Sequence, residues 1–233
     1  MKPAVLHGRD CIEYGTIQHA EHGGWGLALC RGLESPAPKQ DPNEDSCGVV
    51  TVSGASVAVV ADAHFGRSSA ETAVDALLYA AMSSPPDNDP IGWLKGRLSK
   101  INRRVLLGSS ACALLAVVVQ EDWLSWASIG DCRLYRLRSE QTVVLNPLEG
   151  RYLGDWRLLS VSTGEYSLQA GDRIILASDG LPECRYNIPT LSAHQVGQIA
   201  TGGTAQQAAI NLTTAALEHG GEDNIAVALL SHR

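Results

Sequence analysis

The chain has 233 residues, of which 45% are hydrophobic, and this suits one domain with a sizeable core. Its net charge is −7 without a long run of Lys or Arg, so the charge pattern typical of proteins that bind nucleic acid or an anionic membrane is absent. No segment is apolar enough for a signal peptide or a membrane span, and we therefore expect a cytoplasmic protein.

The first half of the chain predicts three strands followed by two helices. Trp25–Cys30 alternates apolar and small residues as a strand does, and Ser46–Val52 and Val57–Asp62 are separated by a short turn that suits an antiparallel hairpin. Ser68–Ser83 has apolar residues at helical spacing and is followed by two prolines. A second amphipathic helix is predicted from about Ile91 to Leu107.

Four further strands are predicted without a helix between them, which favours antiparallel sheet. They are Ala111–Val119, Trp123–Gly130, Cys132–Leu137 and Thr142–Leu145.

The last third of the chain begins with an irregular segment, Asn146–Gly164. Tyr166–Leu168 and Arg173–Ala177 then flank a turn with Asp172, and we interpret them as a hairpin. Two helices and a final buried strand are predicted after it, and they are Leu191–Ala200, Thr204–His219 and Asn224–Leu230. This order of elements indicates an α+β fold in which helices pack on sheets.

Acidic residues stand at the ends of the predicted strands. Asp62, Asp131 and Asp179 each follow an apolar run, while Asp223 and the pair Glu44-Asp45 each precede one. If the strands share a core, these carboxylates can converge at one edge. Close anions raise one another's pKa, and bound cations are the usual compensation. The sequence therefore predicts metal ions held by oxygen ligands.

Each acidic residue alone could serve only a turn, but the segments around them together resemble a known set of motifs. The segments are Asn43-Glu44-Asp45, Val60-Ala61-Asp62-Ala63-His64-Phe65-Gly66, Ile129-Gly130-Asp131-Cys132-Arg133, Leu176-Ala177-Ser178-Asp179-Gly180-Leu181 and Gly220-Gly221-Glu222-Asp223-Asn224-Ile225. In this order they resemble the signature blocks of the metal-dependent protein serine/threonine phosphatases of type 2C, in a short bacterial-type form.

The resemblance implies one catalytic domain over residues 1–233, recognisable from about 25 to 230. Its fold would be two antiparallel β-sheets in a sandwich flanked by α-helices on both faces, in four layers. Its cofactors would be two Mn²⁺ or Mg²⁺ ions, with a weaker third in some members. The implied metal ligands are Asp62 as the bridge, Asp179, Asp223, the carbonyl of Ala63, Glu44 and Asp45 through water, and Asp131 for the third ion.

The activity that the resemblance implies is removal of phosphate from phosphoserine and phosphothreonine in proteins. The nucleophile would be a hydroxide bound by the two ions, and His64 would be the general acid that protonates the leaving oxygen. The partners would be phosphorylated proteins and an opposing Ser/Thr kinase, with the chain acting as a monomer.

The chain departs from the family pattern where substrate would bind. Lys39 and Gln40 stand where a phosphate-binding Arg is expected, and Lys can neutralise a phosphate but not grip it with two hydrogen bonds. Ala63 and Phe65 replace glycines, and the segment after Leu145 is too short for the usual flap. A regulatory module of the same fold with impaired catalysis, or a phosphatase of small molecules, are therefore alternatives.

Other catalytic patterns are absent from the sequence. There is no GxSxG, GxxxxGK[ST], GxGxxG or HExxH motif. The 6 cysteines form no CxxC pair, and we expect them to be reduced thiols in the core.

Overall fold

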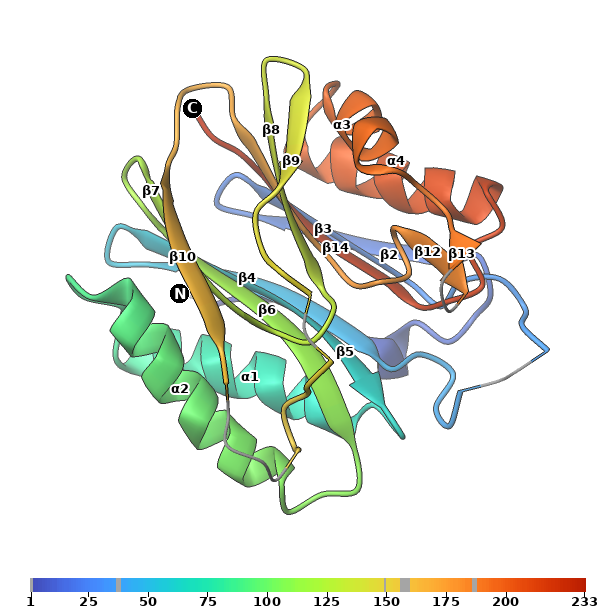
Figure 1. Cartoon of the computed structure of the whole chain (residues 1–233), viewed down its shortest axis with the longest axis horizontal. Helices are drawn as coiled ribbons and strands as arrows, with labels where there is room; N and C mark the ends of the chain where they lie inside the picture. The colour runs from blue at the N-terminus through green and yellow to red at the C-terminus, as the bar shows by residue number, and fades with distance from the viewer. Residues whose placement is uncertain (1, 37–38, 149, 156–159, 186–187) are drawn as a thin grey trace.

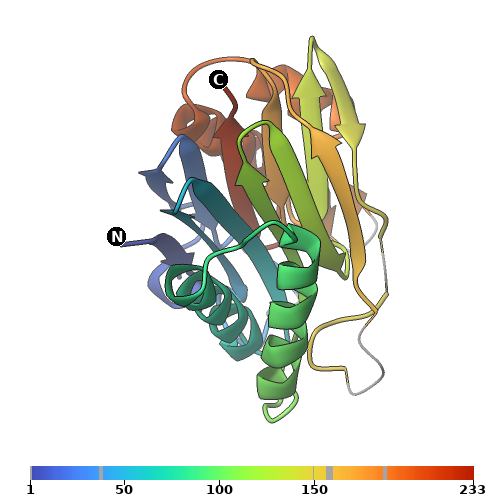
Figure 2. The same cartoon turned by 90° about the vertical axis from the view of Figure 1, so that its left-hand side faces the viewer.

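Two antiparallel sheets face each other, and helices cover the outer face of each (Figures 1 and 2). The computed structural model describes the whole chain except residues 1, 37–38, 149, 156–159 and 186–187. The four-layer α+β sandwich that the sequence predicts is confirmed. In the described part of the chain, every helix is too short or too polar to cross a membrane.

The first sheet contains six strands in the order β1-β4-β5-β6-β7-β10. They are β1 (Ala4–His7), β4 (Asp45–Val52), β5 (Ala55–His64), β6 (Ala111–Gln120), β7 (Trp123–Ile129) and β10 (Ser162–Ser167). The predicted hairpin is β4–β5, and its register pairs Asp45 directly with Asp62.

The second sheet also contains six strands, in the order β2-β3-β14-β11-β8-β9. They are β2 (Ile17–His22), β3 (Trp25–Cys30), β14 (Ile225–Ser231), β11 (Arg173–Ala177), β8 (Arg133–Arg138) and β9 (Gln141–Val144). A small separate ladder joins β12 (Glu183–Arg185) to β13 (Ile188–Pro189). A short 3-10 helix, η1 (Gly8–Asp10), follows β1.

Each sheet has its own pair of helices. α1 (Ser68–Ser83) and α2 (Pro90–Val105) pack on the first sheet, and α3 (Ala193–Ala200) and α4 (Ala205–Glu218) pack on the second. The helix ends follow local rules. The Asp89 side chain accepts the Gly92 N–H at the start of α2, and Ser192 exchanges hydrogen bonds with Gln195 in a capping box at the start of α3.

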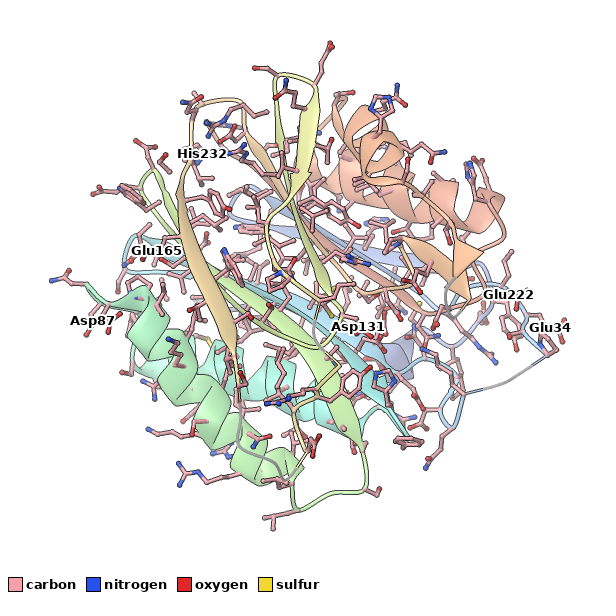
Figure 3. All side chains as sticks on the ribbon, viewed as in Figure 1. Glu34, Asp87, Asp131, Glu165, Glu222 and His232 are labelled. Atoms are coloured by element: carbon pink, nitrogen blue, oxygen red, sulfur yellow. The ribbon has the colours of Figure 1, made fainter. Side chains whose placement is uncertain are left out.

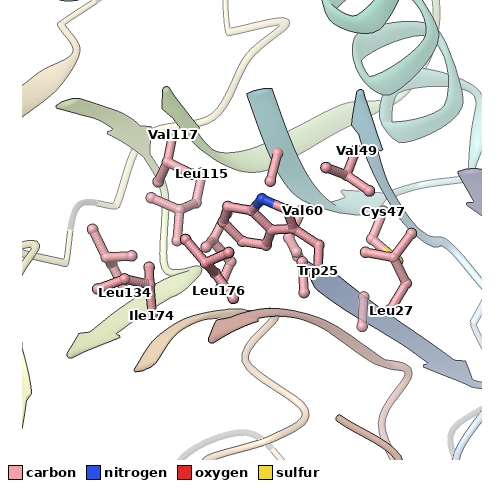
Figure 4. Close-up of a cluster of buried hydrophobic side chains, with 14 of the residues drawn as sticks. Trp25, Leu27, Cys47, Val49, Val60, Leu115, Val117, Leu134, Ile174 and Leu176 are labelled. Atoms are coloured by element: carbon pink, nitrogen blue, oxygen red, sulfur yellow. The ribbon is translucent and has the colours of Figure 1, made fainter. Parts of the chain in front are cut away.

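Strand β5 shows how the alternation of side chains builds the layers. Ala58 and Val60 face the second sheet, whereas Val57, Val59 and Ala61 face α1 and α2. Figure 4 shows the core between the sheets, with Trp25 packed among aliphatic side chains of both. Burial of each large apolar side chain there contributes roughly 1.5–3 kcal/mol, so the core holds the strand ends in fixed positions.

One predicted pairing is wrong. β10 pairs with β7 of the first sheet, while β11 pairs with β8 and β14 of the second, so the two strands do not form a hairpin. Asp172, which we assigned to the hairpin turn, is 1% exposed and accepts hydrogen bonds from Arg138 Nε at 2.7 Å and Nη2 at 2.6 Å. The connection crosses between sheets, and an ion pair between the buried Asp172 and the partly exposed Arg138 fixes it.

Candidate metal centre

The acidic strand ends meet at one edge of the sandwich, as the sequence predicts. Asp45 and Asp62 are cross-strand partners in β4 and β5, and Asp131 follows β7. Asp179 follows β11 and Asp223 precedes β14, its neighbour in the second sheet. Figure 3 shows Asp131 near the middle of the view, whereas Glu34 and Asp87 lie at its rim. Both sheets therefore contribute carboxylates to one cluster.

A glycine allows the two halves of the cluster to approach. A Cβ atom at Gly180 would lie 2.0 Å from the carbonyl oxygen of Asn224 and 3.3 Å from the Asp223 side chain. Only glycine permits this contact, which places the turn after Asp179 directly against Asp223.

Most of the cluster is buried, and many of its oxygens have no partner among the residues that the structure describes. Asp62 is 1% exposed, and both its carboxylate oxygens lack a hydrogen-bond partner. One oxygen each of Asp45, Asp131 and Asp179 is likewise buried and unpartnered. Leaving such groups without a partner is costly. A divalent cation is the ligand that this arrangement fits, because hard cations prefer carboxylate oxygen.

The pKa shifts of the clustered carboxylates also indicate a cation site. Burial, and then the neighbouring carboxylates, raise the pKa of Asp62 and of Asp179 well above the ordinary value. Burial raises the pKa of Asp45 to about 7, although Lys39 and a hydrogen bond from Ser178 act in the opposite direction. Without added positive charge, these groups cannot all be ionised at neutral pH.

Lys39 supplies part of that positive charge. Its Nζ atom contacts Asp223 Oδ1 and lies 3.9 Å from Asp62 Oδ1. Burial lowers the pKa of Lys39, but the charges of Asp62 and Asp223 outweigh it, and the net shift is upward. The residue that we predicted to bind phosphate therefore forms ion pairs with two predicted metal ligands.

Gln40, the second predicted phosphate contact, lies beside the loop at Gly66 and lines the same cleft as His64. The neighbouring Asp41 ties this loop to the start of α1 through hydrogen bonds from the backbone N–H of Arg67 and from its guanidinium.

Glu44 and Ala63 hold the loops around the cluster. Glu44 Oε1 accepts the backbone N–H groups of Asp41 at 3.0 Å and Gly66 at 2.9 Å. The Ala63 N–H donates to the carbonyl oxygen of Glu44 at 3.3 Å. Since the N–H and C=O of a strand residue point to the same side, the Ala63 carbonyl also faces the β4 side of β5.

His64 ends β5 and lies on the same face as Asp62, two residues earlier. Its Nε2 atom is buried, with no hydrogen-bond partner in the described part of the chain, and burial lowers its pKa. A cleft of about 490 Å³ lies in front of it, lined by Lys39, Gln40, Phe65 and Tyr152. Phe65 is 72% exposed and has φ +64°, so it stands at the lip of the cleft in a conformation that favours glycine.

Sequence reasoning missed three residues that shape the site. Tyr152 donates its hydroxyl to Asp131 Oδ2 at 3.2 Å, and its ring meets that of His64 edge-on at 4.4 Å. Ser178 donates to Asp45 Oδ2 at 2.6 Å, and the Asn224 side chain accepts the Glu44 N–H at 2.9 Å. Ser178 and Asn224 lie beside predicted ligands, which is a usable signal, whereas Tyr152 lies in the irregular segment.

The four-layer sandwich with a carboxylate cluster at one edge of its sheets has the fold of the type 2C phosphatase class. The family described as Stage II sporulation protein E (SpoIIE) matches residues 58–233. The chain belongs to this family.

Comparisons with individual proteins agree with this assignment. The chain is 29% identical to the serine/threonine protein phosphatase PstP of Mycobacterium tuberculosis (strain ATCC 25618 / H37Rv), over 79% of the chain, and it spans 41% of the length of that relative. The PstP catalytic domain in complex with two manganese ions has a similar fold, with a TM-score of 0.75, 20% identity and coverage of 89% of this chain and 96% of that one. The serine/threonine phosphatase of S. agalactiae gives a TM-score of 0.75 and 19% identity, covering 90% and 99%.

Proposed function

We propose that the protein is a metal-dependent phosphomonoester hydrolase that removes phosphate from phosphoserine and phosphothreonine in proteins. The observation that carries this proposal is the cluster of buried, unpartnered carboxylate oxygens at the end of β5, with an imidazole beside it. Support also comes from the relatives, which are named as serine/threonine phosphatases.

The donor set fits two ions of Mn²⁺ or Mg²⁺, since all its side-chain donors apart from His64 are oxygens. Asp62 would be the ligand shared by the two ions in this proposal, because neither of its oxygens makes a hydrogen bond in the described part of the chain. Asp179, Asp223 and the carbonyl of Ala63 complete the set, Glu44 and Asp45 act through water, and Asp131 serves a third ion. Bound ions would supply positive charge for the phosphate and lower the pKa of a water molecule.

His64 is the proposed general acid. It faces the cleft from the end of β5, where a substrate phosphate near Asp62 would bring the leaving oxygen within its reach. Burial lowers its pKa, which makes the imidazolium a stronger acid toward a serine or threonine alkoxide while fewer molecules carry that proton at neutral pH. Proton donation matters less for an aryl phosphate, because the phenolate leaves without it.

Lys39 and Gln40 are the proposed phosphate contacts. Lys39 lies in the cleft with its ammonium group at the carboxylates. Once cations neutralise Asp62 and Asp223, that ammonium group would be free to contact a substrate phosphate in the cleft. Gln40 contributes a neutral amide donor at the same wall.

The position of Lys39 also favours a second candidate, a regulatory module with impaired catalysis. An ammonium group that stays with Asp223 and Asp62 would oppose cation binding. Such a module would bind a phosphorylated partner without hydrolysing it.

The cellular setting is part of the proposal. We expect one domain over residues 1–233, because the two described sheets share a core, and a monomer that acts on phosphoproteins opposite a Ser/Thr kinase. A cytoplasmic location is supported by the free, buried thiols of Cys11, Cys30, Cys47, Cys112 and Cys132, since disulfides are rare in that compartment.

The experiment is phosphate release from phosphoserine, phosphothreonine and phosphotyrosine peptides with Mn²⁺, Mg²⁺ or a chelator. We expect metal-dependent release from the first two peptides. Asp62→Asn and Asp179→Asn should abolish it, whereas the matched control Asp87→Asn, an exposed acid outside the cluster, should not. Well-folded protein that binds Mn²⁺ and releases no phosphate would support the regulatory module instead.

A further inference from the structure

Three side chains, two from the end of β5 and one from the turn after β7, form a donor group that differs in chemistry from the rest of the cluster. Each of Asp62, His64 and Asp131 offers one ligand atom, and these three atoms lie within 4.8 Å of one another. Two of the donors are carboxylate oxygens and the third is an imidazole nitrogen. Hard cations such as Mg²⁺ prefer oxygen, whereas Zn²⁺ and its neighbours bind imidazole well.

The spacing suits a single ion. Three donor atoms that bind one Zn²⁺ at about 2.1 Å lie roughly 3.4–3.6 Å apart. The three atoms lie within 4.8 Å of one another, so each side chain needs to move by less than about 1 Å to bind one ion.

The backbone and a neighbouring tyrosine hold the three donors in place. Asp62 and His64 alternate along β5 and so share a face. Tyr152 contacts Asp131 and His64: its hydroxyl donates to Asp131 Oδ2, and its ring meets the His64 ring edge-on. Tyr152 is itself fixed, because the next residue, Leu153, exchanges two backbone hydrogen bonds with Cys112 of β6.

The donor atoms also make no hydrogen bonds within the part of the chain that the structure describes, and the nearest cation to Asp62 Oδ1 is Lys39 Nζ at 3.9 Å. Both oxygens of Asp62, Nε2 of His64 and Oδ1 of Asp131 are buried and make no hydrogen bond. Asp62 is 1% exposed, so water does not solvate it. The Tyr152 hydroxyl occupies only Asp131 Oδ2 and leaves the other oxygen for a ligand.

We propose that Asp62, His64 and Asp131 form a binding site for a transition-metal ion of the Zn²⁺ type, with Tyr152 as its positioning residue. Such an ion takes the imidazole lone pair and one Asp62 oxygen. It therefore competes with the hydrolytic ions and removes the proposed proton donor. The inhibition rests on the proposed function, but the ion binding does not.

The binding test is calorimetric titration of the full chain with ZnCl₂ in the presence of excess Mg²⁺. We expect one Zn²⁺ per chain in the wild type. His64→Ala and His64→Asn should each weaken Zn²⁺ binding at least about 100-fold, and Tyr152→Phe about 10-fold, as loss of a ligand-orienting hydrogen bond does elsewhere. His19→Ala, at an exposed position on β2, is the matched control and should bind as the wild type does.

Co²⁺ serves as a spectroscopic substitute, because a cysteine site would show an intense thiolate charge-transfer band. Wild-type Zn²⁺ affinity in both His64 variants, or a thiolate band, would overturn the proposal. Mn²⁺ titration of the His64 variants should give affinity within about 3-fold of the wild type, since Mn²⁺ is held mainly by oxygen. A loss of Mn²⁺ binding as large as that of Zn²⁺ would also contradict a separate nitrogen-containing site.

Phosphate release separates this proposal from the proposed function. With Mn²⁺ and a phosphothreonine peptide, Zn²⁺ near its measured dissociation constant should halve the wild-type rate. Zn²⁺ binding through His64 in a protein with no Mn²⁺-dependent phosphate release would leave the ion site standing and refute the hydrolase. Activity that Zn²⁺ does not reduce at saturating occupancy would refute the inhibition.

Discussion

The position of Lys39 leads to a quantitative prediction about metal affinity. Its Nζ atom lies 3.9 Å from Asp62 Oδ1, and the two side chains are 27% and 1% exposed. At an effective dielectric constant of about 20, this pair alone is worth roughly 4 kcal/mol. Because a quarter of the Lys39 side chain is in water, we take half of that figure, about 2 kcal/mol, as the net stabilisation of the metal-free protein.

Replacement of Lys39 by Met keeps the apolar stem and removes the charge. In the metal-free protein, Lys39→Met should lower the free energy of unfolding by about 2 kcal/mol, because Asp62 and Asp223 lose their cation. In the metal-bound protein the ions compensate those carboxylates, so the same change costs little. A thermodynamic cycle then requires Mn²⁺ binding to gain about 2 kcal/mol, which is roughly a 30-fold tighter dissociation constant.

Two measurements check both sides of this cycle. Urea unfolding in the presence of EDTA gives the stability of the metal-free protein, and calorimetric titration with Mn²⁺ in the absence of substrate gives the affinity. Lys95→Met, at an exposed position on α2, is the matched control and should change neither quantity. Equal or weaker Mn²⁺ binding by Lys39→Met would refute the reasoning, because it would mean that Lys39 does not compete with cations.

Three further predictions concern pH and stability. Burial raises the pKa of Asp45 from 3.8 to about 7, so between these two values the unfolded chain ionises while the folded protein keeps the proton. The destabilising effect of Asp45 therefore grows as pH rises from about 4 to about 7 and is constant above that. In EDTA, Asp45→Asn should therefore gain about 3 kcal/mol of stability relative to the wild type between about pH 5 and about pH 8, and a pH-independent difference in urea unfolding would exclude this. Phe65→Gly should raise the free energy of unfolding by about 0.5 kcal/mol, because relief of the strain at φ +64° outweighs the backbone entropy of glycine. Little packing is lost, since the Phe65 side chain is mostly exposed. A decrease of more than about 1 kcal/mol in urea unfolding would show instead that the ring packs on the protein. Asp172→Ala should cost about 2 kcal/mol because it removes the acceptor of hydrogen bonds from Arg138 and from the Gln169 N–H, and an unchanged thermal unfolding midpoint would contradict the role of this carboxylate.

The sequence predicts the helices and the central strands well because their signals are local. The predicted bounds of α1 are those observed, and the hairpin β4–β5 follows from two apolar runs joined by a short turn. The carboxylates were predictable for a related reason, since each stands at the end of an apolar run. Convergence at one edge then follows once the strands share a core.

The errors concern partners that are distant in sequence. Nothing local shows that β10 joins the first sheet and β11 the second, because the short turn between them is equally compatible with a hairpin. The strands β1 and β2 were missed because β1 has four residues and β2 is only partly buried. Tyr152 enters the site through one backbone bridge to Cys112, which no periodicity reveals.

Lys39 illustrates a different limit. Its position beside Gln40, where the family resemblance places a phosphate-binding Arg, predicted a role in binding phosphate, but not which carboxylates it would contact. Which carboxylates Lys39 contacts depends on how strongly buried carboxylates attract a cation. This attraction arises only when the cluster is assembled and is not encoded in the loop that carries the lysine.

The direct pairing of Asp45 with Asp62 also protects the hairpin against misalignment. A one-residue slip of β5 would turn Asp62 away from the edge cluster and into the layer where Val59 and Ala61 pack beneath α1. That layer is made of aliphatic side chains, and an ionised carboxylate there would be strongly unfavourable. The carboxylates that would bind cations therefore also disfavour a misaligned β4–β5 hairpin while the protein folds.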